Sequence, residues 1–141
     1  MTTKTVPIVE KIMDANDQVA SVNQKLLDDH NVFAINIMAS PGSGKTSVIL
    51  KTIEALRGKV RIGVIEGDTA PVTIDADKVL AAGMPAVQIN TGGNCHLDAM
   101  MVKRGLEAMN MDEIDLLIIE NVGNLICPAG FALGTHANVV I

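Results

Sequence analysis

Apolar and polar positions along the chain form two alternating patterns, one typical of strands and one of helices. Four short apolar runs have the length of strands buried on both faces: residues 35–38, 60–65, 86–89 and 115–120. Four longer segments are predicted as helices, the first from apolar residues at steps of mostly three or four: residues 6–30, 47–56, 74–82 and 96–109. This alternation predicts a three-layer α/β domain with a mostly parallel sheet flanked by helices.

The ends of these segments indicate how the domain is organised. Gly58 and Gly83 follow predicted helices and suit their carboxyl-terminal caps. Residues 1–31 are expected to hold an N-terminal helix, in one piece or two, that packs on the sheet. Residues 137–141 begin a further strand, and there the chain stops. We therefore expect residues 1–141 to be a single domain that is incomplete at its C-terminus.

A loop of small residues joins the first apolar run to the second predicted helix. It reads Ala39-Ser40-Pro41-Gly42-Ser43-Gly44-Lys45-Thr46-Ser47, the arrangement of a P-loop, and residues 41–47 are the predicted phosphate-binding residues. Its glycines let successive backbone N–H groups turn toward one anion. Lys45 supplies a positive charge for the β- and γ-phosphates, and Thr46 a hydroxyl for Mg²⁺. Ala39 replaces the usual first glycine, which is compatible with a negative φ.

Polar residues follow the other strands at the edge of the sheet where ligands bind. Asp68 and Glu120 each come after an apolar strand, which makes them candidates for Mg²⁺ or water contact opposite Thr46. A turn residue and a satisfied buried carboxylate are the structural alternatives. Asp75 and Asp77 lie where a γ-phosphate-sensing loop is expected, although a solvated helix start explains them equally well. The predicted catalytic residues are Lys45, Asp68, Asp75 and Glu120.

Composition narrows the classes of function. The net charge is −5 and the aromatic residues are two phenylalanines, so a basic surface with stacking aromatics, typical of nucleic-acid binding, is not expected. No apolar stretch approaches the roughly 20 residues that span a membrane, and the polar N-terminus does not resemble a signal peptide. Two cysteines in a nucleotide-binding chain indicate a reducing compartment. We therefore expect a cytoplasmic protein.

Cys95, His96 and Cys127 form a second candidate site. All three are predicted on loops at the carboxyl side of the sheet, and thiolate and imidazole are ligands that suit Zn²⁺ or Ni²⁺. Three ligands leave a tetrahedral ion incomplete, so water, a further residue or the same site on a second subunit would have to complete it. Free cysteines are also common as small buried apolar residues, and spacing alone leaves both interpretations open.

Four blocks of sequence together resemble the HypB family, the hydrogenase nickel-incorporation GTPases of the SIMIBI class of P-loop proteins. The resemblance extends from the N-terminal helix to the last residue and looks most like the archaeal branch. The blocks are Ser40-Pro41-Gly42-Ser43-Gly44-Lys45-Thr46, Glu66-Gly67-Asp68, Asn90-Thr91-Gly92-Gly93-Asn94-Cys95-His96-Leu97-Asp98-Ala99 and Ile119-Glu120-Asn121-Val122-Gly123-Asn124-Leu125-Ile126-Cys127-Pro128-Ala129.

The resemblance implies a metallochaperone that binds GTP with Mg²⁺ and hydrolyses it. GTP would promote a homodimer, in which Cys95, His96 and Cys127 of two subunits bind nickel or zinc at the interface. The partners implied are a small zinc-binding accessory protein and the large subunit of [NiFe]-hydrogenase. As our own hypothesis, Glu120 and the Val122-Gly123 backbone would sense the γ-phosphate, and residues 121–127 would carry the change to Cys127.

Some features depart from the family pattern. Ala132 stands where the family usually has an aspartate, and the cysteine-rich N-terminal nickel motif and histidine-rich tail of some members are missing. The chain also lacks the Asn-Lys-x-Asp motif that selects guanine, so these residues do not themselves define the base. Two alternatives follow. One is an ATPase switch like MinD and ParA, which usually carry an extra lysine where Ser40 stands; the other is an inactive fragment that binds metal or dimerises.

Overall fold

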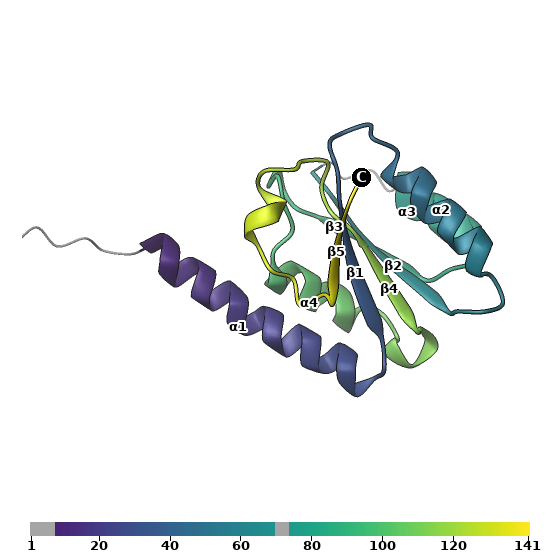
Figure 1. The fold of residues 1–141 in the computed structure, drawn as a ribbon, viewed down its shortest axis with the longest axis horizontal. Coiled ribbons are helices and arrows are strands. Elements are labelled where there is room, and N and C mark those ends of the chain that lie inside the picture. Colours follow the sequence, from purple (N-terminus) through teal and green to yellow (C-terminus); the bar gives the residue numbers. More distant parts are fainter. Residues whose placement is uncertain (1–7, 70–73) are drawn as a thin grey trace, which may run out of the picture.

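The computed structural model of the chain describes residues 8–69 and 74–141, with side chains described for residues 12–69 and 77–141. Within these residues the strands form one five-stranded sheet, and helices cover both of its faces (Figure 1). This is the three-layer α/β architecture that the alternation of apolar patterns predicts.

All strand pairs in the sheet are parallel, in the order β3-β2-β4-β1-β5. The strands are β1 (Phe33–Met38), β2 (Ile62–Asp68), β3 (Ala86–Asn90), β4 (Leu116–Glu120) and β5 (Ala137–Val140). Because every strand runs the same way, the loops that follow β1, β2, β3 and β4 emerge along one edge of the sheet. Candidate residues far apart in the sequence are therefore brought to one side of the molecule.

The helices divide between the two faces of the sheet (Figure 1). α1 (Ile8–Asp29) and α4 (Ala99–Glu107) cover one face, and α2 (Lys45–Leu56) and α3 (Ile74–Ala81) cover the other. Two short 3₁₀ helices, η1 (Met111–Glu113) and η2 (Pro128–Gly130), lie in the loops around β4. The N-terminal helix is one continuous element rather than two.

Central strand β4 supplies side chains to the apolar cores on both faces. Leu117 and Ile119 pack in the core under α1 and α4, and Ile118 packs in the core under α2 and α3. Successive side chains of a strand point to opposite faces, so a strand covered on both sides has to be apolar at every position. This requirement explains the unbroken apolar run in the sequence.

Most predicted boundaries differ from the structure by one or two residues, and the second strand and fourth helix differ by up to three. The second strand was expected at 60–65, but β2 begins at Ile62 and continues to Asp68, because pairing with β3 and β4 extends it through Glu66. The fourth helix was expected from residue 96 and begins at Ala99. Asp98 caps it, its side chain accepting a hydrogen bond of 2.9 Å from the backbone N–H of Met101.

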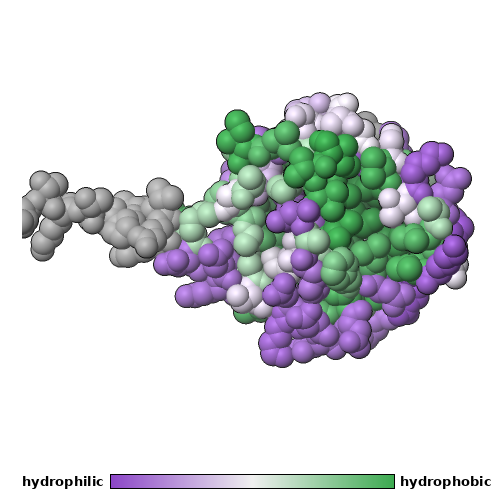
Figure 2. Space-filling model, viewed as in Figure 1, coloured by the Kyte–Doolittle hydropathy of each residue, from purple (hydrophilic) through white to green (hydrophobic). Residues whose placement is uncertain are grey.

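Apolar residues gather on the viewed surface around β5, the last strand of the sheet on that side (Figure 2). Val140 of this strand is 63% exposed, and Phe33 at the start of the neighbouring strand is 51% exposed.

Among the helices of the described residues, none combines the length and apolar character needed to cross a membrane.

Two buried asparagines fasten α1 to the rest of the domain. Asn16 donates to the backbone carbonyl of Ala132 at 2.7 Å and accepts from the N–H of Ala99 at 2.8 Å. Asn23, fully buried, donates to the carbonyls of Ala99 at 2.8 Å and Leu133 at 3.0 Å. Ala132 therefore contacts α1 through its backbone, a contact that does not depend on its side chain.

Replacing Asn23 with alanine should lower the free energy of unfolding by about 1–3 kcal/mol, because two buried carbonyls lose their donor. Ser21→Ala on the same helix is the matched control. Among the described residues its hydroxyl bonds to the Asp17 carbonyl alone, at an exposed position, so a change within about 0.5 kcal/mol is expected. Urea unfolding of the three proteins measures both values, and equal midpoints for Asn23→Ala and wild type would contradict the anchoring role.

Candidate functional site

The P-loop connects the end of β1 to the first residue of α2. Gly42 and Gly44 adopt positive φ angles of 72° and 95°, a region that glycine enters without strain. Ala39 is fully buried, and the only residue other than glycine with a positive φ in the described segments is Asn31, so the alanine fits the conformation predicted for it. α2 begins at Lys45 without a side-chain cap, which leaves its first N–H groups available to an anion.

A cavity of about 320 Å³ opens above this loop. Lys45, only 9% exposed, reaches it from the start of α2, and Glu120 reaches it from the end of β4. The P-loop residues predicted to bind phosphate thus surround a space with a lysine and the amino end of a helix, which is the arrangement that binds a polyphosphate. The lining residues are Gly42, Ser43, Gly44, Lys45, Thr46, Ser47, Lys78 and Glu120.

Thr46 and Glu120 meet directly in this cavity. The Thr46 hydroxyl donates to Oε1 of Glu120 at 3.1 Å, and Glu120 is 4% exposed. The pairing of β2 with β4 places Glu66, 3% exposed, beside Glu120. The Glu120 carboxylate and the Thr46 hydroxyl at the cavity, with Glu66 on the neighbouring strand, form a group of hard oxygen donors, the ligand type that Mg²⁺ prefers.

The other predicted carboxylates lie elsewhere. Asp68 is the last residue of β2, half-buried, opposite Asn90 of β3, and it is not among the residues that line the cavity. Asp75 lies in α3, but its side chain is outside the described residues. Two residues near the cavity were not predicted as site residues: Lys78, which lines it from α3, and Glu66. An acidic residue at the end of an apolar run is a signal that Glu66 shares with Glu120.

The loop after β4 touches the P-loop at one point. A Cβ placed on Gly123 would lie 3.1 Å from the Cα of Pro41, closer than nearly all real contacts of that kind. Glycine is therefore required here by close approach rather than by backbone conformation. Gly123, predicted to contact the nucleotide, lies against the P-loop.

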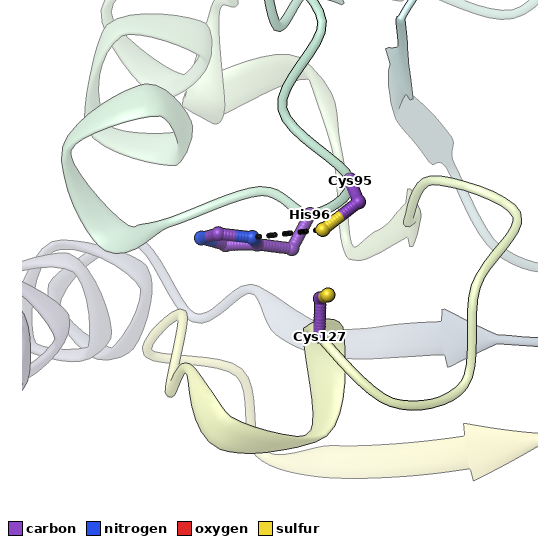
Figure 3. A group of neighbouring side chains, drawn as sticks. All are labelled: Cys95, His96 and Cys127. Atoms are coloured by element: carbon purple, nitrogen blue, oxygen red, sulfur yellow. Dashed lines mark hydrogen bonds between the residues drawn. The ribbon is translucent and has the colours of Figure 1, made fainter.

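Cys95, His96 and Cys127 come together on the same side of the sheet (Figure 3). Cys95 and His96 lie in the loop between β3 and α4, and Cys127 is the cap residue of η2. One ligand atom from each residue lies within 4.8 Å of the other two, and the three side chains are half-buried. They are the only group of three or more such side chains in the described part of the chain that could hold a metal ion.

The spacing of this cluster suits a single ion. Cys95 Sγ lies 3.8 Å from Nδ1 of His96. With bonds of about 2.3 Å to sulfur and about 2.0 Å to nitrogen, two ligands of one tetrahedral zinc are about 3.5–3.8 Å apart. Two thiols with an imidazole also match the softer first-row metals rather than Mg²⁺ or Ca²⁺.

A neighbouring aromatic ring and a hydrogen bond within the cluster affect its ligands. Phe131 stacks on the His96 ring with centroids 4.0 Å apart and planes 17° apart, which orients the imidazole. A hydrogen bond with Cys127 raises the pKa of the Cys95 thiol above its ordinary value, and burial acts in the same direction. The contact with Phe131 was not predicted, because nothing in the spacing of residues 96 and 131 indicates it.

The comparisons with known proteins agree with this geometry. A family model described as the nucleotide-binding domain of CobW/HypB/UreG matches residues 33–139. The chain is 49% identical over 134 residues to a probable hydrogenase maturation factor HypB of Methanocaldococcus jannaschii, covering 95% of this chain and 60% of that one. It is 46% identical over 138 residues to HypB of Azotobacter chroococcum, covering 98% and 45%. The chain thus spans about half the length of these curated relatives.

Two solved structures share the fold. HypB from Archaeoglobus fulgidus superposes with a TM-score of 0.82 at 42% identity, covering 91% of this chain and 62% of that one. HypB from Helicobacter pylori, solved in complex with nickel, gives 0.85 at 35% identity, covering 89% and 59%. From the family match and these relatives together, the chain belongs to the CobW/HypB/UreG family of nucleotide-binding domains.

Proposed function

We propose that this chain is a GTP-dependent metal switch that binds nickel or zinc and assists nickel insertion into [NiFe]-hydrogenase. One observation carries the proposal: a single segment, residues 120–127, begins with Glu120 in the P-loop cavity and ends with Cys127 in the metal cluster. The relatives named hydrogenase maturation factor and the HypB structure solved with nickel support the same reading.

The proposed chemistry at the nucleotide is electrostatic. The P-loop N–H groups and Lys45 would stabilise charge on the γ-phosphoryl group while water attacks in line. Lys78 lines the cavity from α3 and adds a second positive charge near that group. Asp75 would orient the attacking water. Hydrolysis then removes the negative charge that these groups bind, and this loss is what changes the conformation of the loops around the cavity.

Mg²⁺ fits the oxygen donors at this end of the cavity. Thr46 and Glu120 are already in contact there. Asp68, which ends β2 and does not itself line the cavity, is the further carboxylate that we propose as a direct or second-sphere partner of the ion. When bound, Mg²⁺ would supply positive charge that stabilises the negative charge of the phosphates. The hydrogen bond between Thr46 and Glu120 keeps both oxygens on one side of the P-loop.

The nickel or zinc ion is cargo rather than a fixed cofactor. Cys95, His96 and Cys127 give three ligands, one fewer than a closed tetrahedral site. An open position suits release of the ion, and a second copy of the chain brought close by GTP could share the site across a homodimer. A small zinc-binding accessory protein and the hydrogenase large subunit are the proposed partners in delivery.

The decisive experiment measures Ni²⁺ and Zn²⁺ affinity, by competition with a chromophoric chelator, in the presence of GDP or a non-hydrolysable GTP analogue. We expect the two nucleotides to give different affinities. Loss of a residue that only supports a metal ligand typically weakens metal binding by about 10–100-fold. Cys95→Ala and Cys127→Ala each remove a ligand itself, so each should weaken binding by no less than that. Identical affinities in both nucleotide states would contradict a nucleotide-dependent switch.

Two further outcomes of this experiment separate the alternatives. An ATP analogue that changes metal affinity more than the GTP analogue, or turnover of ATP that is indifferent to Cys95→Ala, would favour an ATPase switch. Metal binding without nucleotide binding would favour an inactive fragment.

Lys45→Ala should weaken binding of a triphosphate analogue by about 10–150-fold, because a charged hydrogen bond to phosphate contributes about 1.5–3 kcal/mol. Lys51→Ala is the matched control on the same helix, since Lys51 is exposed and pairs only with Glu54 at 3.5 Å among its described contacts. Isothermal titration of both variants measures the difference. Equal losses in the two variants would argue against a phosphate role for Lys45.

Phe131→Ala should weaken metal binding by about tenfold, because the His96 ring loses the surface that orients it. The chain offers a matched control in its other stacked pair, Phe33 and His136, with centroids 5.0 Å apart. Phe33→Ala removes a similar contact away from the cluster and should leave metal affinity unchanged. Chelator competition with both variants provides the comparison, and wild-type affinity in Phe131→Ala would show that the stacking is incidental.

A further inference from the structure

We propose that Asn121 is a positioning residue that ties the Cys95–His96 loop to the nucleotide end of β4, so that both metal-ligand segments respond together to the nucleotide. The inference rests on the proposed function, since it concerns how the two sites communicate. It adds a second connection to the covalent one, which runs along residues 121–127 to Cys127 alone.

The hydrogen bonds of Asn121 carry the inference. This residue directly follows Glu120, is 1% exposed, and its backbone N–H bonds to the carbonyl of Ile37 in β1 at 3.0 Å. Its side-chain Oδ1 accepts from the N–H of Leu97 at 3.1 Å and from its neighbour Val122 at 2.9 Å. One amide oxygen therefore joins the loop after β4 to the loop after β3.

The side-chain nitrogen of Asn121 fixes the orientation of that oxygen. Nδ2 donates to Oδ1 of Asn36 in β1 at 3.1 Å, and Asn36 in turn donates to Asn138 of β5 at 3.3 Å. Asn36 is 2% exposed, so the hydrogen bond that holds Asn121 to β1 is buried. Because the donor end of Asn121 is held by β1, its acceptor end is aimed at Leu97.

Leu97 is the residue next to the ligand His96, and it is held from two sides. Its backbone N–H is bound by Asn121, and its side chain, fully buried, fills the space above Gly67 of β2. A Cβ on Gly67 would lie 2.7 Å from Leu97 Cδ2, so no larger residue fits there without displacement. The loop that carries Cys95 and His96 is therefore positioned by contacts made at residue 97.

The end of β4 and the loop after it, which contain Asn121, also contact the P-loop and the first turn of α2. Glu120 bonds to Thr46, and Gly123 lies against Pro41 of the P-loop. A shift of the loop after β4 on loss of the γ-phosphate would move Cys127 through the chain itself and move His96 through Asn121. All three ligands would then change their separation in one step, which changes the affinity for the ion.

The experiment measures the ratio of Ni²⁺ affinities in the GTP-analogue and GDP states, by chelator competition, in wild type and three variants. A wild-type ratio of about 5–150-fold is expected, the usual span of coupling between two sites. Asn121→Ala should lower the ratio well below the wild-type value, leaving only the part that the covalent connection to Cys127 carries. Asn121→Asp keeps an oxygen that can accept from Leu97 but loses the Nδ2 donor that Asn36 holds, so its ratio should lie between those of Asn121→Ala and wild type. The control Asn23→Ala removes an equally buried amide that reaches neither the P-loop nor Leu97, and should keep the wild-type ratio.

The outcomes distinguish this inference from the proposed function. A wild-type ratio of one would overturn the proposed function itself. A wild-type ratio well above one that persists in Asn121→Ala, or that falls equally in Asn23→Ala, would overturn the role of Asn121 and leave the switch intact. If Asn121→Ala does not fold, Asn36→Ala takes its place, since it removes the oxygen that holds the Asn121 amide in position, and an unchanged ratio there would overturn the inference. Linkage supplies a second readout, because nickel must change nucleotide affinity by the same factor.

Discussion

Parallel pairing of β4 with both β1 and β2 is the constraint on which the rest of the structure depends. It places the end of β4 beside the P-loop that follows β1 and beside Glu66 of β2. The apolar side chains of β4 serve the cores on both faces, so the strand cannot move independently of either layer. Glu120 is thus held at the P-loop cavity, and the adjacent Asn121 is held against the Cys95–His96 loop.

Much of this arrangement can be derived from the sequence because the signals for it are local. An apolar run buried on both faces, a glycine with positive φ and a lysine at the start of a helix each follow from a few neighbouring residues. The boundaries that failed depend on tertiary contacts instead. Strand β2 continues through Glu66, which pairs with β3 and β4, and Asp68, which pairs with β3. Helix α4 starts late because Asp98 caps it.

The candidate site divides in the same way. Thiols and an imidazole identify Cys95, His96 and Cys127 as ligand types, but only the fold brings their atoms within 4.8 Å. Lys78, Phe131 and Asn121 carry no such chemical label. Residues of these types are common in similar positions without any functional role. These three are distinguished by contacts with segments distant in the sequence, which hydrophobic periodicity and motif spacing do not reveal.

The magnitudes suffice for the two sites to influence each other. Coupling of about 5–150-fold corresponds to about 1–3 kcal/mol. A typical hydrogen bond contributes about 0.5–1.5 kcal/mol, and an abandoned buried partner costs about 1–3 kcal/mol. The hydrogen bond that Glu120 accepts from Thr46 and the one that Asn121 accepts from Leu97 together contribute a free energy in that range. The two acceptors are consecutive residues at the end of β4. In the proposed switch, a displacement that stretched both bonds would therefore be large enough to alter metal affinity.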